Sequence, residues 1–149
     1  MDYIQQIQQN LRTQSQENNI LNLIDEQIKL HEQGFVKSIK DRWLSGLDPD
    51  GGKIGSYSGF PYAEKKNKRN SKAGFWNVDL TLTGLLGNEL VINEISKTQH
   101  VFGSQVSYFN DVVERYGLKQ FNITEAERDE FLSSAYAEII MICLNKAYE

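Results

Sequence analysis

The stretch Asp48–Leu86, DPDGGKIGSYSGFPYAEKKNKRNSKAGFWNVDLTLTGLL, decides how the chain is organised. It begins with a glycine-rich turn over residues 48–58, continues through a basic segment over 64–72, and ends in an alternating segment over 78–86. Glycine and proline recur throughout residues 46–77, so we expect this part to be mostly irregular. An irregular segment of that length inside a compact domain is uncommon and is typically functional or disordered. We therefore predict an extended arm over 46–77, held between a helix and a sheet.

Aromatic side chains stand on both sides of the basic segment in this arm. They are Tyr57, Phe60, Tyr62, Phe75 and Trp76. Aromatic side chains bury more apolar area than other residues. We expect them to pack at the base of the arm while the basic segment reaches outward, and we take them, with Thr83 and Gly84 where the arm rejoins the sheet, as candidate subunit-interface residues.

The basic segment 64–72 has a local charge of +4 in a chain whose net charge is −4. Because the rest of the chain then carries −8, the protein does not have the charge of a general nucleic-acid binder. The segment could still contact DNA or an acidic partner, or it could be a solvated loop. The candidate contact residues are Lys65, Lys66, Lys68, Arg69 and Lys72.

Two amphipathic helices are predicted to flank the centre of the chain. Residues 20–45 carry an apolar stripe at helical spacing that includes His31, which we expect to be buried and hydrogen-bonded. Gly34 marks a point where this helix could bend, and Gly46 is suited to end it. A last helix begins at Thr124 and Glu127, which have the spacing of a capping box. Its predicted buried stripe is Leu132, Tyr136, Ile139, Ile140, Cys143 and Ala147.

Between the helices the pattern predicts a small antiparallel sheet. Val78, Leu80 and Leu82 alternate with polar residues, which is typical of a strand with one wet face. Residues 90–95 and 99–102 read as two further strands, followed by a short helix over 107–116. The expected fold is therefore α+β: a single domain over 1–149, with a polar, Gln-rich N-terminal extension over 1–19.

Catalytic and metal-binding patterns are weak in this sequence. His31 and His100 are 69 positions apart and have no ligand partners at a suitable spacing. Residues 48–52 start like a calcium loop but have glycine at the fifth and twelfth positions, so a backbone turn explains them. The single cysteine, Cys143, reads as a small core residue. We predict no enzyme activity, no metal and no cofactor.

Three short motifs resemble segments of bacteriophage virion-morphogenesis proteins of the tail-completion or tail-terminator type. They are Gly52-Lys53-Ile54-Gly55-Ser56-Tyr57-Ser58, the lysine-containing arm that follows it, and Leu80-Thr81-Leu82-Thr83-Gly84-Leu85-Leu86. A fourth segment, Tyr116-Gly117-Leu118-Lys119-Gln120-Phe121-Asn122-Ile123-Thr124-Glu125, is similar to one in proteins of phages infecting gut Bacteroidota, including the crAss-like group. The resemblance covers about two thirds of the chain, from residue 40 onward.

This resemblance implies a structural subunit of the phage neck or tail, located in the virion and assembled in the host cytoplasm. Such subunits form closed rings of about six or twelve copies, and a closed ring needs a heterologous interface between neighbouring subunits. The implied partners are further copies of the chain and other neck, portal or tail proteins, with a possible non-specific contact to genomic DNA in the lumen. No apolar run approaches the roughly 18 residues of a membrane span, so we expect no membrane partner.

Two other functions stay open at the level of sequence. A small DNA-associated module would use the basic segment 64–72. A hydrolase would use His100 with partners that the sequence does not reveal.

Overall fold

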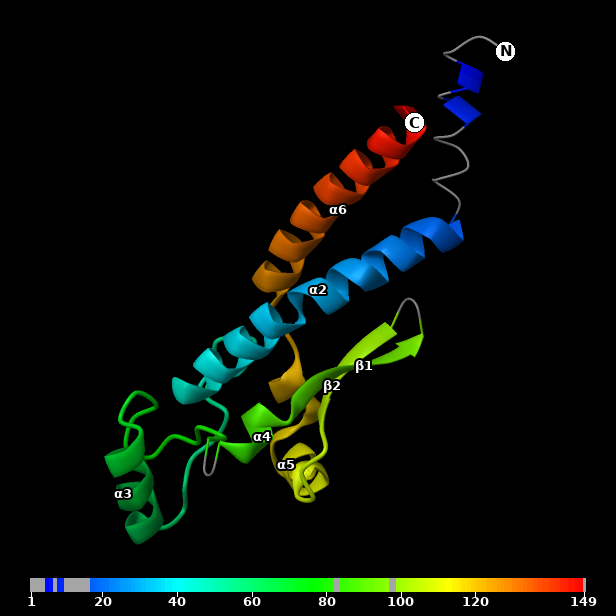
Figure 1. Cartoon of the computed structure of the whole chain (residues 1–149). Coiled ribbons are helices and arrows are strands. Elements are labelled where there is room, and N and C mark those ends of the chain that lie inside the picture. Colours follow the sequence, from blue (N-terminus) through cyan, green and yellow to red (C-terminus); the bar gives the residue numbers. More distant parts are fainter. Residues whose placement is uncertain (1–4, 7, 10–16, 82–83, 97–98, 149) are drawn as a thin grey trace.

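The computed structural model describes residues 5–6, 8–9, 17–81, 84–96 and 99–148. Most of the predicted extension over 1–19 and the candidate residue Thr83 lie outside these residues. The elements are α2 (Glu17–Leu44), α3 (Phe60–Arg69), α4 (Leu85–Asn88), β1 (Leu90–Ser96), β2 (Gln99–Ser104), α5 (Phe109–Tyr116), the 3-10 helix η1 (Leu118–Phe121) and α6 (Glu125–Tyr148) (Figure 1). The predicted α+β class, with a long helix near each end of the chain, is confirmed.

Helix α2 is the central helix of the molecule and matches the helix predicted over 20–45. It runs through Gly34 without a break. It ends in a Schellman motif: the Gly46 N–H donates to the Trp43 carbonyl over 2.9 Å, and the Leu47 N–H donates to the Arg42 carbonyl over 3.2 Å. Gly46 has a φ of +71°, which a residue with a side chain adopts only at a cost. The sharp end of α2 directs the chain into the arm.

The sheet has two strands among the described residues, where three were predicted. β1 pairs antiparallel with β2, with Ile92 opposite Phe102. The hairpin is held against α2, because the Glu32 carboxylate accepts a hydrogen bond of 2.8 Å from the Ile92 N–H. The predictions over 90–95 and 99–102 are therefore confirmed.

The strand predicted from Val78 onward is wrong for residues 78–81. Val78 and Asp79 are consecutive and both buried, at 2% and 1% exposure, whereas a strand with one wet face would bury only one of them. Leu80 then takes a φ of +41°, which interrupts any extended run. Residues 78–81 instead form an irregular segment between the arm and the core, in which apolar and polar residues happen to alternate.

The arm is also not the irregular segment that was predicted, because residues 60–69 form α3. Gly59 stands at the N-cap position and Pro61 lies in the first turn, where its missing N–H removes no helical hydrogen bond. Ala63 and Lys66 form the buried face. Figure 1 shows α3 standing apart from the remaining helices, beyond the C-terminal end of α2. The basic residues of the arm therefore lie largely on a helix.

The core lies between α2, the base of the arm, α4, β1 and η1. Its buried members are Val36, Ile39, Trp43, Ile54, Val78, Leu86, Leu90 and Phe121. The short helix predicted over 107–116 is confirmed as α5, and Gly117, with a φ of +86°, follows it as expected. In the described part of the chain, no helix is both long enough and apolar enough to cross a membrane.

Helix α6 packs on α2 through a different stripe from the predicted one. Its buried residues are Phe131, Ala135 and Ile139, whereas Tyr136 and Ile140 are 51% and 58% exposed. The Phe131 ring lies 5.2 Å from the Phe35 ring. Of the predicted stripe, Ile139 is buried, Leu132 and Cys143 are partly buried, and the side chain of Ala147 is outside the described set.

His31 sits at this crossing of the two long helices, as a structural residue. Its Nδ1–H donates to the Gln27 carbonyl over 2.9 Å, and its ring lies 5.4 Å from that of Phe131. The prediction of a hydrogen-bonded histidine on the apolar side of the helix is confirmed, although its burial is partial.

Candidate functional site

Asp79 joins the arm to the body of the protein. Its carboxylate forms an ion pair with Lys66 and accepts hydrogen bonds from the Tyr57 hydroxyl over 3.2 Å and the Asn70 amide over 2.9 Å. The same Asn70 amide donates to the Leu44 carbonyl over 2.8 Å. One buried carboxylate thus connects the start of the arm, helix α3 and the end of α2.

The electrostatics of this cluster favour a fixed structural role. Burial alone would raise the pKa of Asp79, but hydrogen bonds from Lys66, Asn70 and Thr81 together lower it. The pKa of Tyr57 is raised, first by burial and then by the neighbouring charge of Asp79. The carboxylate therefore stays ionised and the phenol stays protonated near neutral pH, so neither exchanges a proton in that range.

Two backbone hydrogen bonds close the arm at its base. The Tyr57 N–H donates to the Trp76 carbonyl over 2.8 Å, and the Val78 N–H donates to the Gly55 carbonyl over 3.0 Å. The segment between them, which contains α3, is therefore closed at its base by backbone hydrogen bonds. A segment closed in this way presents its outer side chains in one fixed place.

The glycine-rich turn before the arm is stabilised from within. The Asp48 carboxylate accepts hydrogen bonds from the backbone N–H groups of Asp50 and Gly52, over 3.1 and 2.7 Å. Lys119 reaches both carboxylates, at 2.7 Å from Asp48 and 3.0 Å from Asp50, and its hydrogen bond lowers the pKa of Asp48. The Asp48 carboxylate thus stabilises the turn from within, and the Lys119 ammonium pairs with both carboxylates of the turn.

The aromatic residues of the arm divide into two groups. Tyr57 is half-buried against the core, and its ring meets that of Tyr62 edge-on at 5.0 Å. Phe60, Phe75 and Trp76 form a separate cluster, with ring centroids 5.3 to 6.2 Å apart. Phe60 is 59% exposed and Trp76 is 45% exposed. The prediction that the five aromatics pack at the base of the arm is therefore wrong for these two and for Tyr62, which is 42% exposed. We call Phe60, Phe75 and Trp76 the arm patch.

The predicted basic contacts are also not equivalent. Lys66 is 4% exposed and bound to Asp79, so it is wrong as a surface contact. Lys68 pairs with Glu64 along α3 over 3.0 Å. Lys65, Arg69 and Lys72 have exposed side chains. Lys65 and Lys72 give the exposed surface of the arm positive charge, and Arg69 lines the pocket described next.

Gly84, the remaining candidate, is exposed and has a φ of +77° at the start of α4. It lines a pocket of about 320 Å³ together with Lys40, Lys66 and Arg69. The structure therefore places Gly84 behind the arm, away from the arm patch.

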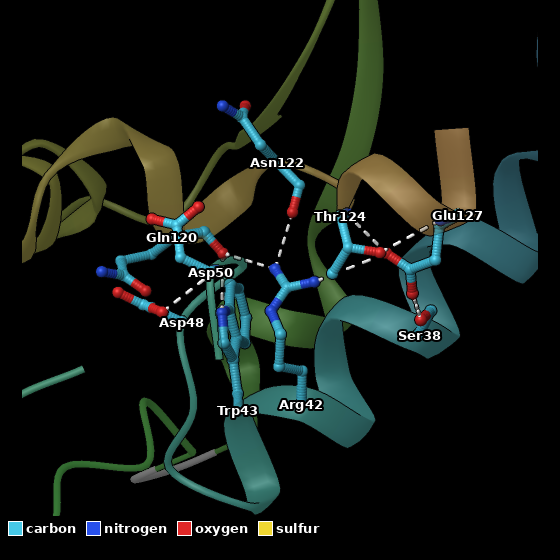
Figure 2. A network of polar contacts seen from close by, with 9 residues as sticks. All are labelled: Ser38, Arg42, Trp43, Asp48, Asp50, Gln120, Asn122, Thr124 and Glu127. Carbon is cyan, nitrogen blue, oxygen red and sulfur yellow. Dashed lines mark hydrogen bonds and ion pairs between the residues drawn. The ribbon is translucent and has the colours of Figure 1, made fainter. Parts of the chain in front are cut away.

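Figure 2 shows a polar network that fixes η1 and the start of α6 on the end of α2. The Arg42 guanidinium donates to the carbonyls of Gln120 and Asn122 over 3.2 and 2.6 Å. The Trp43 indole N–H also donates to the Gln120 carbonyl, over 2.9 Å. Sequence reasoning missed this network, because its acceptors are backbone carbonyls about 80 positions away.

The predicted capping box belongs to the same network and is confirmed. The Thr124 hydroxyl accepts from the Glu127 N–H over 3.1 Å, and the Glu127 carboxylate accepts from the Thr124 N–H over 2.6 Å (Figure 2). Glu127 also accepts a hydrogen bond from Ser38 on α2. The first turn of α6 is thus held in a defined position relative to α2.

This arrangement leaves an apolar groove between α2, the hairpin and α6. Its volume is about 410 Å³, and its apolar lining is formed by Ile28, Phe35, Ile92, Phe102, Ile123, Phe131 and Leu132. The polar side chains of Asn122 and Arg128 also line it. His100 stands at the groove, with its Nε2 bound to the Asp25 carboxylate over 2.8 Å. Hydrogen bonds from Lys29 and His100 lower the pKa of Asp25. The hydrogen bond between His100 and Asp25 fixes β2 on α2.

The polar clusters of the described residues hold elements together, and they offer no group of three or more histidine, cysteine or carboxylate side chains that could bind a metal ion. Comparison of the chain with protein-family models, curated proteins and solved structures gives no match. The interpretation therefore rests on the geometry of the arm patch and of the pocket behind the arm.

Proposed function

We propose that this protein is a non-catalytic structural subunit of a phage neck or tail, which assembles with copies of itself into a closed ring through its arm. The observation that carries the proposal is the arm patch, a cluster of three aromatic rings with Phe60 and Trp76 largely exposed. The virion-morphogenesis motifs in residues 52–58 and 80–86 support the choice of a phage assembly.

The arm patch has the composition of an interface centre. Aromatic residues dominate the binding energy of protein interfaces, and tryptophan is prominent among them. Two exposed rings in contact with a third form a compact apolar surface, which gains free energy when a partner covers it. Such a cluster is better explained by assembly than by catalysis.

The support of the arm strengthens this interpretation. The patch is carried by α3 and the segment that follows, and both are fixed to the body by Asp79, Asn70 and the two hydrogen bonds at the base. A surface that is already ordered loses little conformational entropy on binding. A rigid arm that projects from the body can therefore define the angle between neighbouring subunits, as a ring requires.

Native mass spectrometry of the full-length chain tests this function. We expect the wild type to form a closed oligomer of about six or twelve copies. The variant Phe60→Ser/Trp76→Ser should remain folded, because both side chains are exposed, and should be monomeric. The matched control is Leu118→Ser, which removes a side chain of similar exposure, 50%, outside the arm.

A wild type that stays monomeric at every concentration, both alone and with neck, portal or tail proteins from the same genome, would overturn the proposal. Assembly by the arm variant to the same mass as the wild type would overturn the role of the arm patch.

A further inference from the structure

We propose that the pocket behind the arm binds the phosphate group of a small anionic ligand. This pocket, which we call the basic pocket, has a volume of about 320 Å³. It lies between the C-terminal part of α2, helix α3 and helix α4, and residues 80–81 complete its walls. None of the three aromatic residues of the arm patch lines it. Ligand binding there is therefore separate from the assembly proposed above.

The charged side chains that line the basic pocket are all positive. They belong to Lys40, Lys66 and Arg69. No carboxylate is found among the described residues of its lining, although the chain as a whole has a net charge of −4. The pocket of about 380 Å³ beside His31, in contrast, is lined by Glu127 and Glu130. The basic pocket therefore favours an anion over a cation.

The three cations of the basic pocket have different roles. Lys66 is 4% exposed, and its charge is balanced by the ion pair with Asp79. Lys40 and Arg69 bring two further positive charges to the pocket, one from α2 and one from α3. A phosphate monoester carries about −1.5 to −2 charges at pH 7. Lys40 and Arg69 thus supply the charge that one phosphate group needs.

Lys40 is positioned at the pocket by α4. A Cβ atom at Gly87 would lie 3.2 Å from the Cγ and Cε atoms of Lys40, so this glycine lets the lysine side chain lie across α4. The Lys40 Nζ is 3.5 Å from the Asn88 Oδ1, which is long for a hydrogen bond. Within the described residues, no carboxylate pairs with Lys40. Its ammonium group therefore keeps donors for a ligand.

The donors around the basic pocket suit an anion with several oxygen atoms. Arg69 has five N–H donors in a planar fork, so it can bind two phosphate oxygens and still donate elsewhere. Lys40 adds an ammonium group, Thr81 a hydroxyl and Asn88 an amide. A carboxylate has two oxygen atoms for these groups, whereas a phosphate monoester has three acceptor oxygens. The donor set therefore fits phosphate better than carboxylate.

The size of the basic pocket leaves room for more than the phosphate group itself. Pockets of about 300 to 1,000 Å³ hold small organic ligands. Leu44 and Leu80 contribute apolar walls, against which an organic group can pack. Free phosphate and a small phosphate ester such as a nucleoside monophosphate share the recognised group, and the ester also uses the apolar walls.

Isothermal titration calorimetry of the chain tests the site with three probes: inorganic phosphate, thymidine 5′-monophosphate and thymidine. We expect the monophosphate to bind and thymidine not to bind. Inorganic phosphate that binds as tightly as the monophosphate would identify free phosphate as sufficient, and weaker binding would identify an ester as the ligand. Thermal unfolding should show stabilisation by each probe that binds.

Variants of the two cations connect the binding to the basic pocket. Lys40→Gln and Arg69→Gln should each weaken binding of the monophosphate by about tenfold or more, because each removes a charged hydrogen-bond donor. Lys40→Arg keeps the charge and should retain most of the affinity. The matched control is Lys65→Gln, which removes an exposed charge of α3 outside the pocket and should change the affinity by about twofold at most.

Three results would overturn the inference. The first is that neither phosphate probe gives heat or raises the unfolding temperature. The second is that thymidine binds as tightly as its monophosphate. The third is that the folded Lys40→Gln and Arg69→Gln variants bind like the wild type, or no more weakly than Lys65→Gln. Ring assembly is measured separately by native mass spectrometry, so these results leave the proposed function standing.

Discussion

Asp79 is the residue on which the position of the arm depends. It is 1% exposed and contacts the side chains of Tyr57, Lys66 and Asn70, which come from three parts of the arm. Buried ion pairs contribute little net free energy compared with apolar side chains of the same shape, but removing one partner is costly. Asp79 therefore specifies where the arm lies more than it stabilises the fold.

The variant Asp79→Asn should lose about 3–5 kcal/mol of unfolding free energy, because it leaves the buried Lys66 ammonium without its counter-charge. Urea denaturation at neutral pH measures the loss. The control is Lys68→Gln, which breaks the exposed pair with Glu64 and should cost at most about 1 kcal/mol. Equal effects of the two variants would contradict the role of Asp79.

Acid should weaken the protein through its paired carboxylates. The pKa values of Asp25, Asp48 and Asp79 are all lowered in the folded state. Below about pH 3.9, the ordinary aspartate pKa, the unfolded chain therefore binds more protons than the folded one. The stabilisation is complete above that pH and is lost as the pH falls through the folded-state pKa values.

Urea midpoints measured from pH 7 down to pH 2.5 check this expectation. The wild type should show a falling midpoint at the acid end, and Asp79→Asn should show a smaller fall, because it lacks the contribution of the Asp79 carboxylate. A fall of equal size in both proteins would mean that Asp79 is not held ionised by its partners.

The sequence does not reveal which lysine of the basic segment is buried. Lys65, Lys66 and Lys68 are chemically alike, and each suits an exposed tip. Once α3 is known, Ala63, Lys66 and Asn70 fall on one face at spacings of three and four. Without an apolar stripe to indicate that helix, the face could not be found.

At the scale of elements, Gly34 inside α2 and Gly46 at its C-terminal end have opposite effects on stability. Gly34 lies inside the helix with open space around it, whereas Gly46 has a φ of +71° and its hydrogen would be replaced by a Cβ only 3.0 Å from the Ala73 Cβ. Gly34→Ala should therefore stabilise the protein by about 0.5–1 kcal/mol.

Gly46→Ala should destabilise by about 1–2 kcal/mol from the left-handed backbone alone, and by more if Ala73 cannot move. Thermal unfolding of the two variants and the wild type shows in one experiment whether each substitution stabilises or destabilises the protein. Destabilisation by Gly34→Ala, or a neutral Gly46→Ala, would contradict this account of where α2 needs glycine.

Elements with a clear local signal could be predicted, and elements without one could not. α2 has an uninterrupted apolar stripe, and α6 has a capping box at Thr124 and Glu127. α3 is short and polar, so its only signals were Gly59, Pro61 and a run of good helix formers. The predicted strand at Val78 failed because Asp79 is buried by polar contacts that alternation cannot represent.

The face of α6 was misjudged for a related reason. Apolar residues occur on neighbouring stripes of this helix, so periodicity permits either Phe131 with Ala135 and Ile139, or Leu132 with Tyr136 and Ile140. The contact with α2 determines which stripe is buried, because the rings of His31 and Phe35 on α2 pack against the ring of Phe131. A contact between distant elements is not encoded in the local pattern.

At the scale of the whole molecule, apolar surface and charge are distributed over two separate regions. Helix α3, which carries Phe60 of the arm patch together with Lys65 and Arg69, lies beyond the C-terminal end of α2 (Figure 1). The groove lies along the middle of α2, and Arg128 of α6 is among its lining residues.

The central claim is that the arm patch becomes covered when the chain assembles, and the protein carries its own probe for this. Of its two tryptophans, Trp43 is 1% exposed and Trp76 is 45% exposed. Acrylamide quenching of tryptophan emission, measured across a dilution series whose mass is followed by sedimentation, therefore reports on Trp76. We predict strong quenching in the monomer and a marked loss of quenching as the mass rises. Assembly that leaves the quenching of Trp76 unchanged would contradict the account.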